Sequence, residues 1–242
     1  MVDEATLRDE LATVARRTYD AGYAAATDGN VSARLSAETL LISPSGCCLG
    51  ELQPDELIPV DLDGRARLES PGRRPTSEFR MHLAVYQARP DVSAVLHAHP
   101  PITIAFSIAG ESLEPCIIPE VVVGLGTIPT VDYTTPTTPE TAAAVGREIA
   151  RRDALVLQNH GTVTVGRRIV DAFYKLDKVE HSARILLAAR QLGEVSALPP
   201  HEVERLLGMR ETMGLPPIVP SRPNPAPTVE GHPDSLRRTT FE

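Results

Sequence analysis

The stretch VLHAHPP, residues 95–101, constrains this 242-residue chain more than any other. An apolar run ends in two histidines one residue apart, and two prolines follow. Alternate side chains of a strand point to the same face, so His97 and His99 are expected to project together, about 7 Å apart along the chain. The prolines suit the entry of a helix. The stretch predicts one wall of a metal site, although two surface histidines on an edge strand would also fit it.

Further ligands of this kind occur elsewhere in the chain. The stretch LVLQNHGTVTVG predicts an apolar strand that ends at His160, before Gly161, which can turn the backbone sharply. Glu78 is expected in the first turn of a helix that begins near TSEFR, where it would face the helix N-terminus as a capping acid, with Thr76 or Ser77 as the N-cap. Three imidazoles and one carboxylate suit a divalent transition metal, Zn²⁺ first, with Mn²⁺, Co²⁺ or Mg²⁺ as alternatives.

The remaining histidines lack such partners in the sequence and are expected to be structural or exposed to solvent. They are His82, His181, His201 and His232. His82 lies one helical turn after Glu78, so it could support the site from behind the ligands.

Two loops of small residues, TDGNVS and SPSG, present backbone N–H groups and hydroxyls of the kind that bind anions. Singly, each is also consistent with an ordinary turn. Combined with a helix start, they predict a phosphate pocket. Its candidate residues are Thr27, Asn30, Ser45, Gly46, Thr76 and Ser77.

Helical and strand-like patterns alternate without a long linker, which predicts one α/β domain over residues 1–213. The expected helices cover residues 1–22, 76–91, 101–110, 138–153 and 168–193. The expected strands lie within residues 30–35, 39–46, 92–99 and 154–166, with a charged turn at 60–70 and short strands and turns at 116–133. Residues 214–242 form a proline-rich tail, which cannot continue a helix or join a central strand.

Composition limits the partners and the compartment. A net charge of −8 and an aromatic content of 4% argue against a nucleic-acid surface, which needs clustered Lys and Arg with stacking rings. No signal peptide or membrane span is visible, so a cytoplasmic protein is expected. Three cysteines form neither a disulfide framework nor a CxxC motif.

The motifs resemble those of the class II aldolase/adducin family, most closely its L-fuculose-1-phosphate aldolase branch. The resemblance runs from about residue 5 to residue 210 and rests on TDGNVSARL, ISPSG, TSEFRMHLAVYQARPDVSAVLHAHPP, TVDYTTPTTPE and LQNHGTVTVG, in that order. Thr76 stands where these aldolases usually have serine, and it keeps the hydroxyl. The tail matches no closing segment of the aldolases.

The resemblance implies a fold, an assembly and a site. The fold is a three-layer αβα arrangement with a central, mostly antiparallel sheet, assembled as a homotetramer whose active sites lie between subunits. The implied phosphate pocket is the set of loop residues named above. The implied metal ligands are Glu78, His97, His99 and His160. Tyr133 matches a tyrosine that a neighbouring subunit supplies, although a turn tyrosine packed at an interface would also fit.

The implied activity is reversible cleavage of a ketose-1-phosphate to dihydroxyacetone phosphate and an aldehyde, through a metal-stabilised enediolate. Glu78 would transfer the proton at carbon, and Tyr133 would handle the proton of the aldehyde oxygen. The main alternative is a metal-dependent decarboxylase of a sugar-acid phosphate or an aromatic acid. Members that act on unphosphorylated substrates often have His at the position of Asn30, so Asn30 favours a phosphorylated sugar.

Two other activities of the family fit less well. The pentulose-phosphate 4-epimerases typically carry Asp at the position of Glu78. The adducin-like binding modules lack the metal histidines, whereas this chain has all three.

Overall fold

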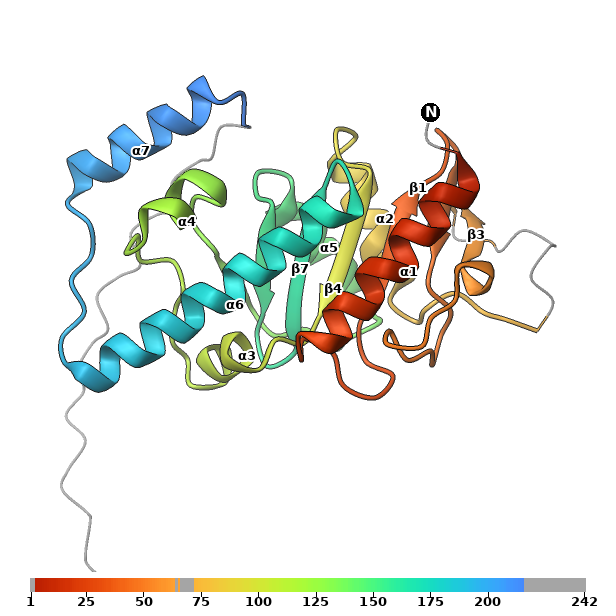
Figure 1. The fold of residues 1–242 in the computed structure, drawn as a ribbon, viewed down its shortest axis with the longest axis horizontal. Helices are drawn as coiled ribbons and strands as arrows, with labels where there is room; N and C mark the ends of the chain where they lie inside the picture. The colour runs from red at the N-terminus through yellow and green to blue at the C-terminus, as the bar shows by residue number, and fades with distance from the viewer. Residues whose placement is uncertain (1–2, 64, 66–71, 216–242) are drawn as a thin grey trace, which may run out of the picture.

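The computed structural model describes residues 3–63, 65 and 72–215. Within them a seven-stranded sheet has the order β3-β2-β1-β4-β7-β6-β5 (Figure 1). Its strands are β1 Asn30–Arg34, β2 Thr39–Ile42, β3 Ile58–Asp61, β4 Ala94–Ala98, β5 Thr130–Val131, β6 Ala154–Leu157 and β7 Gly161–Gly166. The pair β5 and β6 is parallel, and the other neighbouring pairs are antiparallel. The prediction of a mostly antiparallel sheet is confirmed.

Helices cover both faces of the sheet. They are α1 Glu4–Asp20, α2 Phe79–Ala88, α3 Pro101–Ile108, α4 Pro119–Gly124, α5 Pro139–Ile149, α6 Ile169–Leu192 and α7 Pro200–Thr212, with a 3-10 turn η1 at Pro54–Glu56. The helices α1 and α6 share one hydrophobic core with the sheet, and α2 and α5 share another on the opposite face. The three-layer αβα prediction is confirmed.

Helix α1 illustrates how local sequence determines an element. Its apolar stripe, including Leu7, Leu11 and Val14, is buried as its spacing predicts. The side chain of Asp3 accepts a hydrogen bond from the backbone N–H of Thr6 and caps the N-terminus. After the helix, Gly22 takes a left-handed conformation with φ of +75°, which glycine adopts without steric cost.

The strands next to the centre are buried on both faces, and their alternation sorts apolar from polar side chains. Val31 and Ala33 of β1 face the core under α1 and α6, as does Leu96 of β4. The intervening residues of β1 therefore face α2. All three are polar: Asn30 and Ser32 are buried, and Arg34 is half-buried. The sheet thus presents polar groups to α2, deep inside the fold.

The segment 116–133 differs from expectation, because it contains the helix α4 before the short strand β5. Its β-branched run favours a strand locally. Tertiary contacts reverse that preference: α7, which the sequence did not predict, packs on α4, and Arg210 of α7 donates 2.8 Å hydrogen bonds to the carbonyls of Val123 and Gly124. These bonds satisfy carbonyls that the end of α4 leaves without helical partners.

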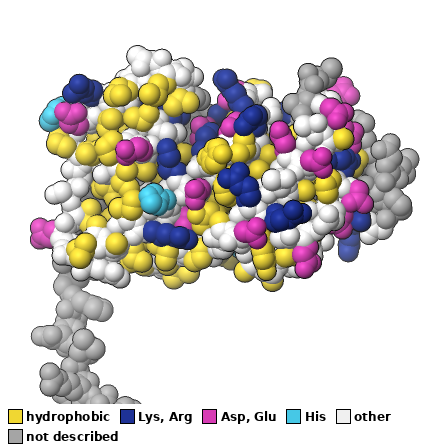
Figure 2. Space-filling view, viewed as in Figure 1, with side chains coloured by type: hydrophobic (Ala, Val, Ile, Leu, Met, Phe, Trp, Pro, Cys, Tyr) yellow, Lys and Arg dark blue, Asp and Glu magenta, His cyan; other side chains and the backbone are white. Residues whose placement is uncertain are grey.

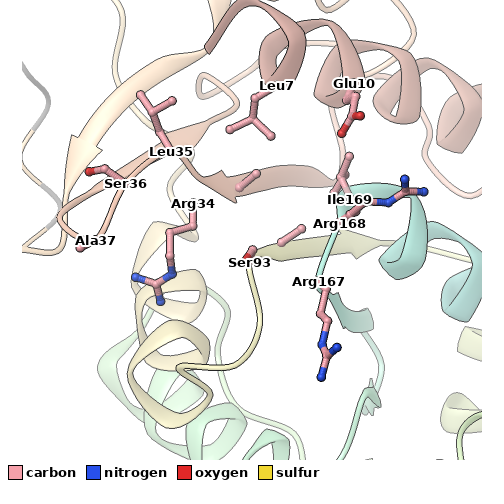
Figure 3. Close-up of a pocket in the computed structure, with 12 residues that line it drawn as sticks. Leu7, Glu10, Arg34, Leu35, Ser36, Ala37, Ser93, Arg167, Arg168 and Ile169 are labelled. Atoms are coloured by element: carbon pink, nitrogen blue, oxygen red, sulfur yellow. The ribbon is translucent and has the colours of Figure 1, made fainter. Parts of the chain in front are cut away.

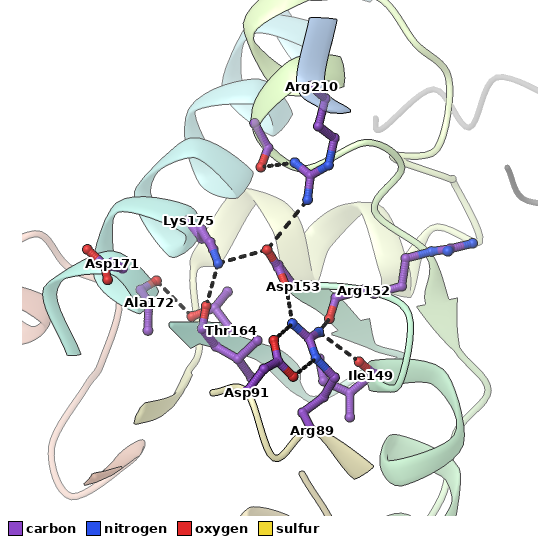
Figure 4. A network of polar contacts seen from close by, with 12 residues as sticks. Arg89, Asp91, Ile149, Arg152, Asp153, Thr164, Asp171, Ala172, Lys175 and Arg210 are labelled. Carbon is purple, nitrogen blue, oxygen red and sulfur yellow. Dashed lines mark hydrogen bonds and ion pairs between the residues drawn. The ribbon is translucent and has the colours of Figure 1, made fainter. Parts of the chain in front are cut away.

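A buried network links α7 to the body of the domain (Figure 4). Asp153 lies 3.6 Å from Arg210, 3.0 Å from Arg89 and 2.8 Å from Lys175. Arg89 also donates to the backbone carbonyls of Ile149 and Arg152. Because one buried carboxylate serves three cations from separate elements, it fixes the C-terminal helix against the sheet.

Other predicted segments lie partly outside the described residues. The predicted charged turn at 60–70 overlaps the end of β3, and residues 64 and 66–71 are not described. The same holds for most of the tail, residues 216–242. Among the described residues, no helix is both long enough and apolar enough to span a membrane.

Candidate metal centre and active site

Three histidines converge at one edge of the sheet. His97 and His99 come from the end of β4, and His160 from the turn between β6 and β7. Their ring centroids are 4.8 to 5.1 Å apart, and one nitrogen of each ring lies within 4.8 Å of the others. The Nε2 atoms of His97 and His99 are 3.0 Å apart. The structure therefore brings together the three imidazoles that the sequence proposed as ligands.

Close pairing of β4 with β7 produces this convergence. Ala98 pairs with Thr162 in the antiparallel register. A Cβ atom on Gly161 would lie 2.5 Å from the Ala98 carbonyl oxygen and 2.6 Å from the His99 ring. A glycine at position 161 is thus needed for β7 to lie this close to the end of β4. The expected sharp turn is instead made by Asn159, which has a left-handed φ of 57°.

Glu78 joins the histidines, but not as the capping acid that the sequence suggested. It is the N-cap residue of α2 and makes no side-chain capping bond, so neither the first-turn position nor an N-cap at Thr76 or Ser77 is correct. Its Oε2 lies 3.1 Å from Nε2 of His97, and its Oε1 lies 3.5 Å from Nε2 of His160. The carboxylate is turned away from the helix and toward the imidazoles.

The protonation of the site suits metal binding. The Nδ1–H of His97 donates a 2.8 Å bond to the Thr162 carbonyl, which leaves Nε2 facing the centre. Burial and the charge of His97 lower the pKa of His99 to about 4 and that of His160 to about 4, so both are neutral at pH 7. Burial opposes ionisation of Glu78, but the charge and hydrogen bond of His97 outweigh it and lower the pKa of this carboxyl.

The spacing of the donor atoms fits a small divalent cation. In a tetrahedral zinc site with bonds of about 2.0 to 2.1 Å, neighbouring ligand atoms are about 3.3 Å apart. The separations here are 3.0 Å between two Nε2 atoms, 3.1 Å from His97 to Glu78 and 3.5 Å from Glu78 to His160. The three imidazole nitrogens lie within 4.8 Å of one another, so the imidazoles, with the Glu78 carboxylate beside two of them, could hold such an ion once the more distant nitrogens move closer.

Asn30 has protein partners on both sides of its amide. Its Nδ2 donates a 2.9 Å hydrogen bond to Oε2 of Glu78, and its Oδ1 contacts Nε2 of His82. The His82 ring is completely buried, with its Nδ1 2.7 Å from Oγ of Ser32. Ser32 and Tyr86 were not singled out from the sequence. The signal was present in the polar alternation of β1 and in the spacing of Glu78, His82 and Tyr86, which follow one another at intervals of four residues.

The remaining histidines outside the proposed ligand set were expected to be structural or exposed to solvent. His181 and His201 are exposed. His232 lies outside the described residues.

The SPSG loop of the expected phosphate pocket lies beside residues 74–76, which precede Glu78. The backbone N–H of Ser45 donates to the Arg74 carbonyl at 2.8 Å, and that of Thr76 donates to the Ser43 carbonyl at 3.1 Å. Ser45, Gly46 and Ser77 are exposed, whereas Thr76 is buried. The structure therefore places the SPSG loop next to the residues that precede Glu78.

Thr27 lies on a separate exposed turn. The adjacent Asp28 carboxylate is 3.6 Å from Nδ1 of His99, so this turn borders the imidazoles. Gly29 closes the turn with φ of +79°, and a Cβ there would lie 3.0 Å from the His97 carbonyl oxygen. A side chain at this position would push the turn away from the site.

Tyr133 follows β5 and is 55% exposed. Its backbone N–H donates to Oε1 of Gln158 at 3.0 Å, which fixes the chain where β5 ends. The phenol is thus presented to the surroundings of the subunit.

A separate cavity of about 340 Å³ lies at the other end of β4 (Figure 3). Ser93 and Ala94 line it there, with Leu7, Arg34 and Arg167 among its other walls. Because His97 and His99 lie at the opposite end of the strand, this cavity is distinct from the candidate metal centre.

Removal of one imidazole is expected to abolish stable metal binding. The His99→Ala variant should lose most of the metal that wild-type protein retains after dialysis, because the loss of one ligand strongly weakens a site of this kind. Elemental analysis of the purified proteins measures this. His181→Ala, which removes an exposed imidazole, is the matched control and should keep its metal. Stoichiometric metal and full activity in His99→Ala would show that the assignment is wrong.

The metal-free protein is expected to lose stability as the pH falls from 6.5 toward 4. The pKa values of His99 and His160 are lowered from 6.5 to about 4, and burial lowers that of His82 to about 3. In this window the unfolded chain takes up protons that the folded protein does not, so the folded state is disfavoured. His97 does not offset this loss: the Glu78 carboxylate raises its pKa despite burial, so its stabilising contribution changes above pH 6.5 and is nearly constant in this window.

Urea unfolding in the presence of a chelator, at several pH values across this window, measures the effect. His160→Gln should weaken the pH dependence, because it removes one of the three groups responsible. A free energy of unfolding that rises on acidification would contradict the expectation.

Comparison with known proteins finds relatives that match most of this chain. The sequence profile described as Class II Aldolase and Adducin N-terminal domain matches residues 9–187. An L-fuculose phosphate aldolase of Methanocaldococcus jannaschii is 32% identical over 176 residues, covering 72% of this chain and 92% of the relative. A 3-oxo-tetronate 4-phosphate decarboxylase of Escherichia coli strain K12 is 32% identical over 188 residues, covering 76% and 87%.

Solved structures of similar fold include proteins of the same kind. A solved L-fuculose 1-phosphate aldolase superposes with a TM-score of 0.78 at 27% identity, covering 87% of this chain and 97% of that structure. The profile match spans most of the domain and includes the three histidines and Glu78. The chain belongs to the class II aldolase and adducin family.

Proposed function

We propose that this protein is a metal-dependent aldolase that reversibly cleaves a ketose-1-phosphate, of the L-fuculose-1-phosphate kind, to dihydroxyacetone phosphate and an aldehyde. The observation that carries the proposal is the position of Glu78. Its carboxylate contacts His97 and His160 and directly follows Thr76 and Ser77, which lie beside the SPSG loop. One carboxylate therefore borders both the expected metal ligands and the expected phosphate pocket.

The phosphate would bind where the SPSG loop meets residues 74–77. Ser45 and Ser77 supply exposed hydroxyls, Gly46 and the loop backbones supply N–H groups, and Thr76 and Thr27 supply further hydroxyls. Asn30 would contribute the second hydrogen of its amide nitrogen, because its first is donated to Glu78. A substrate held here by its phosphate would have its adjacent carbons near Glu78.

Cleavage breaks the bond between carbons 3 and 4 of the ketose phosphate. The hydroxyl of carbon 4 gives up its proton and becomes the aldehyde, a transfer that we assign to Tyr133 of a neighbouring subunit. The bonding electrons pass to carbon 3, and Glu78, after taking up a proton from solvent, delivers it there to give dihydroxyacetone phosphate. The divalent cation, Zn²⁺ by preference, supplies Lewis-acid stabilisation of the developing charge when it is bound.

A decarboxylase is the second candidate, favoured by the relative named 3-oxo-tetronate 4-phosphate decarboxylase. Loss of CO₂ from a sugar-acid phosphate leaves a carbanion that Glu78 could protonate in the same way. An aromatic acid is a weaker candidate, because the exposed loops of the expected pocket suit a phosphate. A binding module without catalysis is the least favoured, because the three imidazoles converge.

We propose a homotetramer with active sites between subunits. Tyr133 is 55% exposed, so its phenol is available to a neighbouring subunit. Figure 2 shows apolar side chains gathered over the end of the molecule that α7 and α4 form. Exposed apolar residues on or next to α6 and α7 include Ile185, Leu187, Leu192, Val195, Met209 and Met213. Such a surface fits contact between copies. The three cysteines are free, which suits the reducing cytoplasm that we propose as the compartment.

An activity screen decides between the two reactions. Metal-loaded protein is offered ketose-1-phosphates, sugar-acid phosphates and aromatic acids, and dihydroxyacetone phosphate and CO₂ are assayed separately. Release of dihydroxyacetone phosphate supports the aldolase. Release of CO₂ alone supports the decarboxylase, and turnover of an unphosphorylated sugar as fast as its phosphate ester would contradict the phosphate pocket.

Glu78→Gln is expected to stop proton transfer at carbon while the three histidines still bind metal. The amide keeps the size of the side chain but is not basic, so exchange of the dihydroxyacetone phosphate C–H proton with deuterated solvent should slow by about 10²- to 10⁴-fold. NMR of the substrate measures this step without C–C bond formation. Glu202→Gln, on the exposed face of α7, is the control. Exchange at the wild-type rate would remove Glu78 from the chemistry.

A subunit-mixing experiment tests the role of Tyr133. Glu78→Gln and Tyr133→Phe are expected to be nearly inactive alone, because each lacks one proton-transfer group. In mixed oligomers formed by co-refolding, about a quarter of the sites would combine an intact Glu78 with an intact Tyr133 from the neighbour. Activity should therefore rise above the sum of the parents. The same proteins mixed without refolding are the control, and no gain after co-refolding would contradict a shared site.

A further inference from the structure

A row of buried polar side chains joins β1 to α2 behind Glu78. We call it the polar ladder, and it consists of Asn30, Ser32, Glu78, His82 and Tyr86. The strand contributes residues two apart and the helix contributes residues four apart, so both sets face each other across the same contact. All five side chains are at most 8% exposed, and the His82 ring is completely buried.

Each member of the ladder contacts the next. Asn30 Nδ2 lies 2.9 Å from Oε2 of Glu78, and its Oδ1 lies within hydrogen-bonding distance of Nε2 of His82. The other ring nitrogen of His82, Nδ1, is 2.7 Å from Oγ of Ser32. The Ser32 hydroxyl is also 2.9 Å from the hydroxyl of Tyr86. The chain of contacts therefore runs unbroken from Tyr86 to the carboxylate.

The direction of every hydrogen follows from one constraint. An ionised carboxylate only accepts hydrogen bonds, so the amide nitrogen of Asn30 must face Glu78 and its oxygen must face His82. His82 then carries its proton on Nε2, and its Nδ1 accepts from Ser32. Ser32 has one hydrogen to donate, so it accepts from Tyr86. All the donors point toward Glu78.

The last rung keeps this polarity. Burial raises the pKa of Tyr86, so its hydroxyl stays protonated and can donate. The Arg34 guanidinium lies 4.9 Å from the centre of the Tyr86 ring and donates to the Tyr86 carbonyl at 3.4 Å. Arg34 also lines the cavity of Figure 3, so the Tyr86 end of the ladder lies near that cavity.

The ladder makes the two oxygens of Glu78 different. Oε2 accepts from Asn30 and lies against His97. Oε1 is buried without a hydrogen-bond partner, and the nearest imidazole nitrogen, on His160, is 3.5 Å away. A buried oxygen without a partner is unusual in a folded protein and is best placed to receive a proton.

We propose that His82 is a positioning residue that, through Asn30, holds Oε2 of Glu78 and leaves Oε1 as the oxygen that carries the proton to and from the substrate carbon. The inference rests on the proposed proton transfer by Glu78. It adds a residue that touches neither substrate nor metal, because His82 acts through the orientation of the Asn30 amide.

The first test reads the His82 ring directly and needs no substrate. Protein labelled with ¹⁵N-histidine and loaded with zinc is examined by NMR, and the His82 signals are assigned by their loss in His82→Gln. The expected result is a neutral ring protonated on Nε2. Protonation on Nδ1 would require the Asn30 amide to be reversed and would overturn the proposal.

The second test separates positioning from packing. His82→Phe keeps a buried ring but removes both nitrogens, so kcat should fall by about 10- to 100-fold. KM should stay within about twofold and the metal content should be unchanged. His82→Gln, which can still donate to Asn30, should recover part of the loss. Val85→Ala is the matched control, because it creates a cavity on the same helix without removing a polar group.

Each outcome has a defined meaning. A loss of kcat in His82→Phe no larger than in Val85→Ala would overturn the proposal. Should His82→Phe fail to fold, Ser32→Ala and the ring tautomer decide the question. Should wild-type protein release CO₂ and no dihydroxyacetone phosphate, the aldolase proposal fails. The same variants are then compared in their turnover of the acid that loses CO₂. The ring tautomer remains decisive for the ladder in either case.

Discussion

The antiparallel pairing of β4 with β1 on one side and β7 on the other is the constraint on which the site depends. In this register Asn30 pairs with His97, and Ala98 pairs with Thr162. Three segments far apart in sequence thus end at one edge of the sheet. A slip of one residue would turn His97 to the opposite face, under α1 and α6, and separate it from Glu78. Gly161 maintains this register because a side chain there would meet the Ala98 carbonyl.

Burying polar groups between the sheet and α2 is unfavourable unless each one is paired. The structure meets this condition along β1, where Asn30 and Ser32 each contact two partners. Two buried atoms of this contact are exceptions, Nε of Arg34 at the end of β1 and Oε1 of Glu78. Proteins tend to depart from full pairing at functional sites, and Oε1 of Glu78 lies among imidazoles rather than in the apolar core. Within a few ångströms, paired polar groups thus stabilise the fold while an unpaired carboxylate oxygen is left available for chemistry.

Buried polar groups are also paired at the other end of the molecule, where they hold helices together and have no part in the proposed site. Arg210 reaches from α7 to the last carbonyls of α4 and to Asp153, which also binds Arg89 and Lys175. A helix of β-branched residues is stabilised there by a cation 86 residues away in sequence. Local patterns favoured strands and turns for this segment because propensity carries no information about such a distant partner.

The sequence by itself determined the main layers, the stop of α1 near Gly22 and the start of α5 at Thr138, and it singled out the three histidines, because periodicity and capping are local properties. It also proposed Glu78 as a fourth metal ligand, with a helix-capping acid as the alternative. Only the tertiary structure decided that its carboxylate turns to His97 and His160, that Gly161 serves close strand contact, and that Asn30 is shared between Glu78 and His82. These facts depend on register and on which faces of β1 and α2 meet, which separate segments of sequence cannot specify alone.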